Sequence, residues 1–226
     1  MTPGGGGATV VILAKDSRSA KTRLQLPREG ARQVALHLAS ATVRAVLEAE
    51  HVGAVLVVTG DPEIALDALD AGADVLVEPR PLGMNRAAEL GRRQATALAP
   101  GSALATMVAD LPYLRPGDID SVLAEFWETG HPLFVADRMG SGTTLVVHRP
   151  DVGPGFGFGP RSAVMHGRLG YRESLAAPSG LRTDLDSRED LARLVGRLYR
   201  GRQGHHVTRR TVRSWATGPR VQAASG

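Results

Sequence analysis

Cysteine is absent from this sequence of 226 residues, which excludes disulfide bonds, a thiolate nucleophile and thiolate metal ligands. No apolar run approaches the roughly 20 residues that a membrane-spanning helix needs. The start, Met1-Thr-Pro followed by four glycines, lacks the basic and then apolar order of a secretory signal. Hydrophobic residues make up 42% of the chain and charged residues 22%, which is ordinary for globular proteins. We therefore expect a cytoplasmic protein with no membrane partner.

Lysine is almost absent as well. The chain has only two lysines, Lys15 and Lys21, and both lie in the loop after the first apolar run, whereas arginine is abundant. Chance clustering in an arginine-rich protein is one explanation. The other is that a compact ammonium group serves phosphate chemistry there that a guanidinium fork performs differently.

Acidic residues are missing from Arg197 to the end of the chain, a stretch that holds seven arginines. The net charge is +4, so the rest of the chain is slightly acidic and the pI of about 10.1 does not describe it. We expect one domain over residues 1–200 and a basic, disordered tail over residues 201–226. Nucleic acid is not an expected partner, although a nucleic-acid-binding or protein-binding arm is the alternative for the tail.

Strand-like and helix-like segments alternate along most of the chain. The apolar run at residues 8–14 is typical of a strand buried on both faces. We predict strands at residues 8–14, 54–59, 74–77, 103–109, 132–136 and 143–148, and helices at residues 28–50, 63–71, 86–98, 116–128 and 187–199. This alternation predicts an α/β fold, a mostly parallel sheet with helices on both faces.

Ligands of open α/β sheets bind outside the carboxyl ends of the strands. The first loop at that edge carries Lys15, Arg18, Lys21 and Arg23 beside serine and threonine hydroxyls, a set suited to a triphosphate. It is not a P-loop, because the Gly-x4-Gly-Lys-Ser/Thr spacing is absent. A basic surface loop without a ligand is the alternative.

Carboxylates follow at two further places of the same edge. Asp110 comes directly after the strand at residues 103–109, where it is suited to hold Mg²⁺. Asp184 and Asp186 point to one side if the backbone there is extended. The alternatives are that Asp110 caps a turn and that Asp186 caps the last helix.

Glycine clusters between residues 140 and 159, near Thr143 and Ser162. Exposed backbone amides, hydroxyls and an arginine at such positions suit an anionic group, and a plain hairpin turn is the alternative for the first piece. The seven histidines show no metal-ligand spacing. Neither Gly-x-Ser-x-Gly nor His-Glu-x-x-His occurs, so the sequence gives a hydrolase little support.

Short pieces of these loops occur in an order and at a spacing that resemble the CofC family over residues 8–198. The pieces are Lys21-Thr-Arg-Leu24, Gly83-Met-Asn85, Ala109-Asp-Leu-Pro112, Phe134-Val-Ala-Asp-Arg138 with Gly142-Thr143, Phe158-Gly-Pro160 with Ser162, and Leu181-Arg-Thr-Asp-Leu-Asp186. CofC proteins are guanylyltransferases in the biosynthesis of the deazaflavin coenzyme F-420. Their fold is related to that of the molybdenum-cofactor guanylyltransferases.

The resemblance implies a nucleotidyltransferase (Rossmann-like) fold with a mixed central sheet and Mg²⁺ as the cofactor. It implies transfer of GMP from GTP to the phosphate of a small three-carbon acid, whose unstable product passes to the next enzyme. The arginine-rich composition resembles that of actinobacterial members, which favours phosphoenolpyruvate. The acceptors 2-phospho-L-lactate and 3-phosphoglycerate are the alternatives.

The resemblance also implies roles for individual residues. Catalytic roles fall to Lys21, Arg23 and Asp110; nucleotide binding to Lys21, Arg23, Gly83 and Asn85, with Lys15 of the same loop; acceptor binding to Thr143, Gly159 and Ser162; and metal binding to Asp110, Asp184 and Asp186. The sequence departs from the family at Met84, where leucine is commoner, in a slightly long stretch at residues 153–159, and in its basic tail. A molybdenum-cofactor-type guanylyltransferase and a non-catalytic nucleotide-binding or RNA-binding module remain as rival interpretations.

Overall fold

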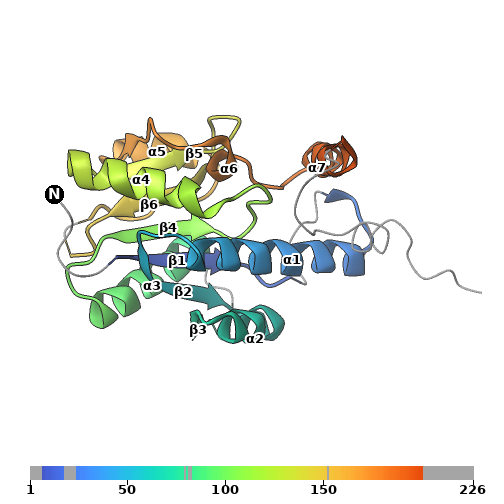
Figure 1. The fold of residues 1–226 in the computed structure, drawn as a ribbon, viewed down its shortest axis with the longest axis horizontal. Coiled ribbons are helices and arrows are strands. Elements are labelled where there is room, and N and C mark those ends of the chain that lie inside the picture. The colour runs from blue at the N-terminus through green and yellow to red at the C-terminus, as the bar shows by residue number, and fades with distance from the viewer. Residues whose placement is uncertain (1–6, 18–23, 79, 81–82, 152, 201–226) are drawn as a thin grey trace, which may run out of the picture.

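A sheet of seven strands forms the centre of the molecule (Figure 1). The computed structural model describes residues 7–17, 24–78, 80, 83–151 and 153–200. The strands are β1 (Ala8–Ala14), β2 (Val52–Thr59), β3 (Asp74–Val77), β4 (Leu104–Val108), β5 (Leu133–Ala136), β6 (Thr143–His148) and β7 (Arg172–Glu173). They follow the order β3-β2-β1-β4-β6-β5-β7. Strand β6 runs antiparallel to β4 and β5, and the other pairs are parallel. The predicted mostly parallel sheet is confirmed.

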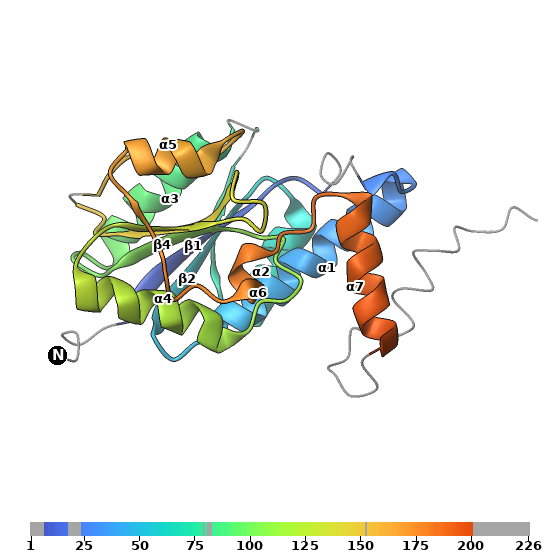
Figure 2. The same ribbon diagram turned by 90° about the horizontal axis from the view of Figure 1, so that it is seen from above.

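Helices cover both faces of this sheet, as predicted. They are α1 (Arg28–Leu47), α2 (Pro62–Ala71), α3 (Met84–Leu98), α4 (Pro116–Thr129), α5 (Ser162–Arg168), α6 (Ser179–Arg182) and α7 (Arg188–Arg200). Figure 2 shows α3 and α5 on one face, with α1 and α4 on the opposite face. Among the described residues, no helix is both long and apolar enough to cross a membrane.

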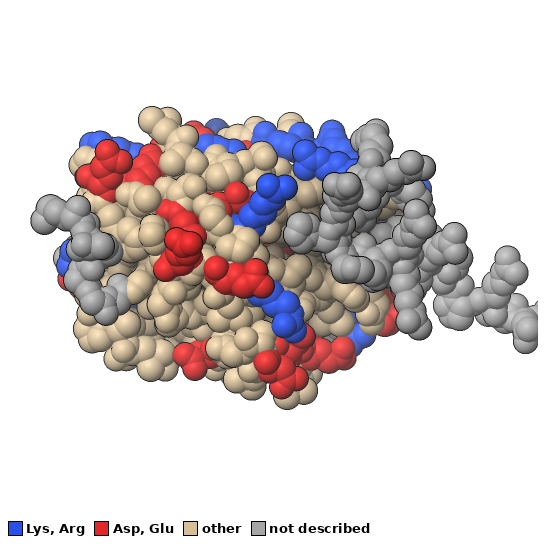
Figure 3. Space-filling model, in the orientation of Figure 1, with Lys and Arg blue, Asp and Glu red and all other residues tan. Residues whose placement is uncertain are grey.

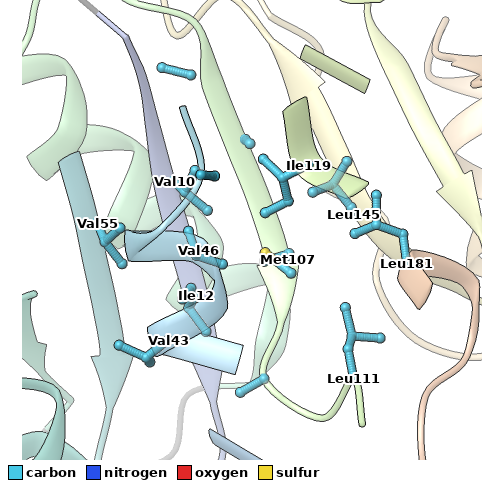
Figure 4. Close-up of a cluster of buried hydrophobic side chains, with 14 of the residues drawn as sticks. Val10, Ile12, Val43, Val46, Val55, Met107, Leu111, Ile119, Leu145 and Leu181 are labelled. Carbon is cyan, nitrogen blue, oxygen red and sulfur yellow. The ribbon is translucent and has the colours of Figure 1, made fainter. Parts of the chain in front are cut away.

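Strand β1 contributes to the core on both faces of the sheet, which explains its uninterrupted apolar sequence. Val10 and Ile12 belong to the cluster on the side of α1 and α4, drawn in Figure 4. Val11 and Leu13 belong to a second cluster on the side of α3. Successive side chains of a strand point to opposite faces, and each buried aliphatic side chain contributes about 1.5–3 kcal/mol. The central strand is therefore held from both layers.

A tight hairpin joins β5 to β6 through residues 137–142. The N–H of Asp137 donates to the carbonyl of Gly142, and the N–H of Gly140 donates to the carbonyl of Asp137. Gly140 has a φ of 72°, in the left-handed region that glycine enters without strain. Since β6 then runs antiparallel, its first residue, Thr143, lies at the edge where the parallel strands end. The hairpin interpretation of this stretch is correct, and the hairpin also brings Thr143 to that edge.

The sequence patterns did not predict three elements of the C-terminal half, namely α5, β7 and α6. Each is short: α5 has 7 residues, α6 has 4 and β7 has 2. Such short segments give too few repeats of a helical or strand period to stand out from chance, and they lie after the regular alternation of strands and helices has ended. The longer predicted elements are all present, with ends that differ by a few residues. For example, α1 ends at Leu47 rather than at residue 50.

Charges of both signs occur on the face formed by α1 and α4 (Figure 3). Lysine and arginine side chains lie there among aspartate and glutamate side chains and uncharged residues. The predicted tail, residues 201–226, lies outside the described residues.

Gly91 of α3 offers a test of the packing between helix and sheet. A Cβ atom at Gly91 would lie 2.5 Å from Cγ1 of Val11 and 3.2 Å from Cγ2 of Val58. We expect Gly91→Ala to lower the free energy of unfolding by about 1–3 kcal/mol, because overpacking moves the helix off the sheet. Gly117 of α4 is the control, since a Cβ there meets no atom within 4 Å. Gly117→Ala should leave stability unchanged or raise it by up to about 1 kcal/mol. Equilibrium urea unfolding decides, and equal effects of the two substitutions would contradict the packing argument.

Candidate functional site

The loops at the carboxyl ends of β1 and β4 enclose a pocket of about 530 Å³. The first residues of β6 and α5 complete its wall. Of the residues predicted from the sequence, the pocket is lined by Lys15, Asp110, Thr143, Gly159, Ser162, Asp184 and Asp186. Segments far apart in the chain therefore meet at the edge that the sheet topology predicts for a ligand.

Three predicted carboxylates meet in this pocket because of Leu185. Its side chain is fully buried in a cluster with Leu24 and with apolar residues of α1 and α7. Its N–H donates to the carbonyl of Asp110 over 3.1 Å. The neighbours of Leu185, Asp184 and Asp186, both line the pocket instead. The expectation that these two carboxylates share one side is therefore met.

Like charges crowd around Asp184. Burial, followed by the nearby carboxylates of Asp110 and Asp186, raises the pKa of Asp184 to about 7, and Asp137 adds to the effect. An arrangement of this kind favours a cation or a proton at the centre of the group. Among the described residues, however, no three histidine, aspartate or glutamate side chains already stand at the distances of a metal cluster.

The first loop is anchored by Asp61, which lies between the predicted strand at residues 54–59 and the predicted helix at residues 63–71. The N–H of Ser17 donates to the carboxylate of Asp61 over 2.9 Å, and the Ser17 hydroxyl donates to the same oxygen. The other oxygen accepts from the N–H groups of Glu63 and Ile64 at the start of α2. Lys15, two residues before Ser17, is exposed in the pocket wall.

Further cations of the first loop fall within residues 18–23, which the structure does not describe. Lys21 and Arg23, predicted as nucleotide-binding and catalytic residues, lie outside the described residues. The next described residue is Leu24, whose side chain is buried.

Asn85 and Gly83 stand at the start of α3, next to Met84, which lines the pocket. The amide of Asn85 donates to the carbonyl of Phe158 over 3.0 Å and accepts from its N–H over 2.7 Å. Gly83 has a φ of 89° and precedes the helix. The structure thus brings Asn85 to the backbone of residues 157–159 rather than into the pocket lining.

Thr143, Gly159 and Ser162 come together as predicted. Ser162 is buried at the start of α5, and its N–H donates to the carbonyl of Gly159 over 3.1 Å. The next residue, Ala163, donates from its N–H to the carbonyl of Ser141 in the β5–β6 hairpin over 3.2 Å. These hydrogen bonds hold the hairpin against α5.

The sequence analysis missed His166, the buried residue behind this group. Its ring contacts Thr143 and the backbone of Gly157. Sequence spacing carried no signal for it, because the contacts join β6 and α5 through space.

A second pocket, of about 680 Å³, lies on the side of α7 and shares Asp137 and Asp184 with the first. Three of its arginines are paired with acids, for example Arg138 with Asp190 over 3.3 Å and Arg182 with Glu173 over 2.8 Å, and Arg197 lies over the ring of Tyr113. Although it is larger, it holds only one of the predicted site residues. The smaller pocket is therefore the candidate site.

No family model matches this sequence. Curated relatives, however, are similar to it over most of its length. The phosphoenolpyruvate guanylyltransferase of Streptosporangium roseum is 40% identical over 192 residues, which cover 82% of this chain and 83% of the relative. That of Thermomonospora curvata is 38% identical over 188 residues, which cover 81% of each. The chain belongs to the phosphoenolpyruvate guanylyltransferase family. The family predicted from the ordered motifs is confirmed.

Solved structures share the fold of this member of the phosphoenolpyruvate guanylyltransferase family. A nucleotide-diphospho-sugar transferase from Desulfovibrio desulfuricans matches with a TM-score of 0.64 over 93% of this chain and 95% of that chain, at 13% identity. A nucleotidyl transferase from Methanothermobacter matches with a TM-score of 0.57 over 87% of this chain and 99% of that chain, at 18% identity. At these identities the likeness concerns the fold, and the predicted nucleotidyltransferase fold is confirmed.

The pH dependence of stability tests whether the charged carboxylate of Asp61 anchors the first loop in this member of the phosphoenolpyruvate guanylyltransferase family. Burial raises the pKa of Asp61, but the hydrogen bonds from Ser17 and from the start of α2 outweigh it and hold the pKa below its usual value. A carboxyl group whose folded-state pKa is lowered stabilises the fold above its unfolded pKa, about 3.9, and loses this contribution as the pH falls through the folded value.

We expect Asp61→Asn to lower the free energy of unfolding at pH 7 by about 1.5–3 kcal/mol, the usual loss for hydrogen bonds to a charged group. The difference from the wild type should shrink as the pH falls below about 4. Denaturant unfolding at pH 7 and at a pH below about 4 measures this difference in the free energy of unfolding. The control is Asp70→Asn, an exposed residue of α2, the helix that Asp61 precedes. A difference that stays constant with pH would show that the charge of Asp61 does not matter.

Proposed function

We propose that the chain transfers the GMP group of GTP to the phosphate of phosphoenolpyruvate. The products are enolpyruvoyl-2-diphospho-5'-guanosine and pyrophosphate. One observation carries the proposal: the carboxylates of Asp110, Asp184 and Asp186 and the anion-binding set around Ser162 line the same pocket. Membership of the phosphoenolpyruvate guanylyltransferase family supports it.

The acceptor is assigned to Thr143, Gly159 and Ser162. Hydroxyl groups and glycine backbone amides bind an anionic oxygen without adding further charge to the pocket. Ser162 is the first residue of α5 and is buried, so the packing around it fixes the position of its side chain. A small planar acid needs only a few such contacts for orientation.

GTP is assigned to the side of the first loop. Lys15 lines the pocket there, and the motif assigns Lys21 and Arg23 of the same loop to the triphosphate. Gly83 and Asn85 at the start of α3 are assigned to the nucleoside. The contact between Asn85 and Phe158 supports a link between the nucleoside side and the acceptor side.

Asp110, Asp184 and Asp186 would hold Mg²⁺. The donor set fits this ion, which prefers a few carboxylate oxygens and completes its shell with water and phosphate oxygens. When bound, the ion neutralises and orients two polyanions that otherwise repel each other.

The reaction needs no general base from the chain. The phosphate of the acceptor is already ionised near pH 7, so one of its oxygens attacks the α-phosphorus of GTP as the bond to pyrophosphate breaks. The pocket residues hold the two reactants in line. Lys21 and Arg23 stabilise the negative charge that gathers on the leaving pyrophosphate. The unstable product then passes to the next enzyme of deazaflavin coenzyme biosynthesis.

A panel of acceptors tests the substrate. With GTP and Mg²⁺, we expect phosphoenolpyruvate to give a guanylylated product and stoichiometric pyrophosphate, identified by mass spectrometry. The controls are 2-phospho-L-lactate, 3-phosphoglycerate and a sugar phosphate under the same conditions. Efficient turnover of another three-carbon acid in place of phosphoenolpyruvate would transfer the assignment to that acid. Turnover of the sugar phosphate alone would overturn the proposal.

Asp110→Asn tests the carboxylate group. We expect the variant to fold and to lose at least about a hundredfold in kcat, as when a preorganised electrostatic group is removed, because a neutral amide is a poor Mg²⁺ ligand. Asp74→Asn, an exposed residue at the start of β3, is the matched control. Steady-state kinetics at saturating Mg²⁺ give the answer. Turnover of Asp110→Asn close to that of Asp74→Asn would remove Asp110 from the proposed site.

A further inference from the structure

His166 contacts Thr143 and Ser162 of the proposed acceptor set, and the segment that leads to Gly159, without lining the pocket itself. Its ring is fully buried on α5, and its Nδ1 lies 3.0 Å from Oγ1 of Thr143. Its Nε2 accepts a hydrogen bond of 3.0 Å from the N–H of Gly157, two residues before Gly159. The ring also hydrogen-bonds to the backbone of Ser162. One side chain thus connects β6, the segment 157–159 and the start of α5.

These partners decide which ring nitrogen of His166 carries the proton. The N–H of Gly157 can only donate, so Nε2 must present its lone pair. In a neutral imidazole the proton then lies on Nδ1, where Oγ1 of Thr143 and the backbone carbonyl of Ser162 share the Nδ1–H as acceptors. A hydroxyl oxygen that accepts this bond keeps its own proton for another partner. Since Thr143 lines the pocket, that proton is available to a ligand.

Aromatic rings hold the imidazole in this orientation. Phe158 and Tyr171 pack edge-to-face against it, with centroid distances of 5.1 Å and 5.3 Å, and Phe134 stacks at 6.4 Å. Burial lowers the pKa of His166 to about 4, although the hydrogen bond to Ser162 opposes the shift. The ring is therefore neutral at physiological pH, and Nε2 stays free to accept from Gly157.

We propose that His166 is a positioning residue that turns the Thr143 hydroxyl into a hydrogen-bond donor toward an anionic group of the acceptor and holds the segment 157–159 beside it. A carboxylate or phosphate oxygen can accept from this hydroxyl, whereas a group that only donates finds no partner. His166 thereby contributes to the choice of an anionic acceptor without touching it. This inference rests on the proposed function, because it places the acceptor at Thr143.

The tautomer can be observed without any substrate. We expect ¹⁵N–¹H correlation spectra of the wild-type imidazoles to show His166 with a proton on Nδ1 and none on Nε2 near pH 7. The assignment comes from the loss of this signal in His166→Phe or, if that variant does not fold, in His166→Asn. A proton on Nε2 instead would overturn the inference, whatever the enzyme's activity.

Three substitutions separate the hydrogen bonds of His166 to Thr143 and to Gly157. His166→Phe keeps a ring but removes both, and we expect it to raise KM for phosphoenolpyruvate by about tenfold or more. KM for GTP should change by less than about threefold. His166→Asn keeps a donor near the position of Nδ1 and should recover most of the acceptor affinity. His166→Gln can accept from Gly157 but leaves Thr143 without its donor, so it should recover less.

His148→Phe is the matched control, because His148 is buried in the same aromatic cluster and its Nδ1 bonds to the carbonyl of Arg149. It should leave the ratio of the two KM values unchanged even where it lowers stability. Thr143→Val adds a coupling test: His166→Gln keeps the bond from Gly157, so, if His166 acts on the acceptor through Thr143, the double variant with His166→Gln should be no worse for phosphoenolpyruvate than Thr143→Val alone. Additive losses, or equal rises of both KM values in His166→Phe, would show a merely structural role.

The two proposals fail in different ways. If the wild-type enzyme makes no product from GTP and phosphoenolpyruvate while His166 carries its proton on Nδ1, the proposed function fails and the assignment of the tautomer stands. If the wild type is active and His166→Phe leaves KM for phosphoenolpyruvate unchanged, the function stands and the role of His166 is refuted.

Discussion

The hydrogen bond from the N–H of Leu185 to the carbonyl of Asp110 is the contact on which the site depends. It joins the segment before α7 to the end of β4, and the burial of the Leu185 side chain locks this junction in the core. Asp184 and Asp186 are then held beside Asp110 although their charges repel. The fold tolerates the repulsion because apolar burial, which is non-directional and collective, stabilises the arrangement from the opposite side.

The antiparallel strand β6 has a comparable effect on the side of the pocket formed by Thr143, Gly159 and Ser162. In a fully parallel sheet, the amino end of each strand lies at the edge away from the ligand, but the hairpin at residues 137–142 inverts β6. Thr143 consequently faces the same pocket as the residues that end β1 and β4. Short elements that lack a clear periodic pattern, above all α5, then fill the space behind Thr143 and carry Ser162 and His166. The irregular half of the chain thus forms the part of the site that differs most from a plain α/β sheet.

The regular half of the fold could be predicted from local patterns. The apolar run at residues 8–14 and the amphipathic pattern of α1 depend on periodicities of a few residues, which burial imposes on any sequence that forms such elements. The short elements α5, α6 and β7 could not be predicted, because they give too few repeats of a period to stand out from chance and do not continue the alternation of strands and helices that revealed β3 and β5. Their conformation depends on tertiary contacts such as that between Ala163 and Ser141.

The sequence by itself determined the α/β class, the edge of the sheet where the predicted site residues meet, and the family, since ordered motifs at strand ends can be read without coordinates. It also named the carboxylates and hydroxyl residues that the pocket brings together. Only the tertiary structure decided that Asp61 anchors the first loop, that Asn85 holds the backbone of Phe158, and that His166 supports Thr143. These are contacts between residues far apart in the chain, and each depends on the direction of a donor or a lone pair. Neither composition nor spacing records such directions; they exist only once the chain has folded.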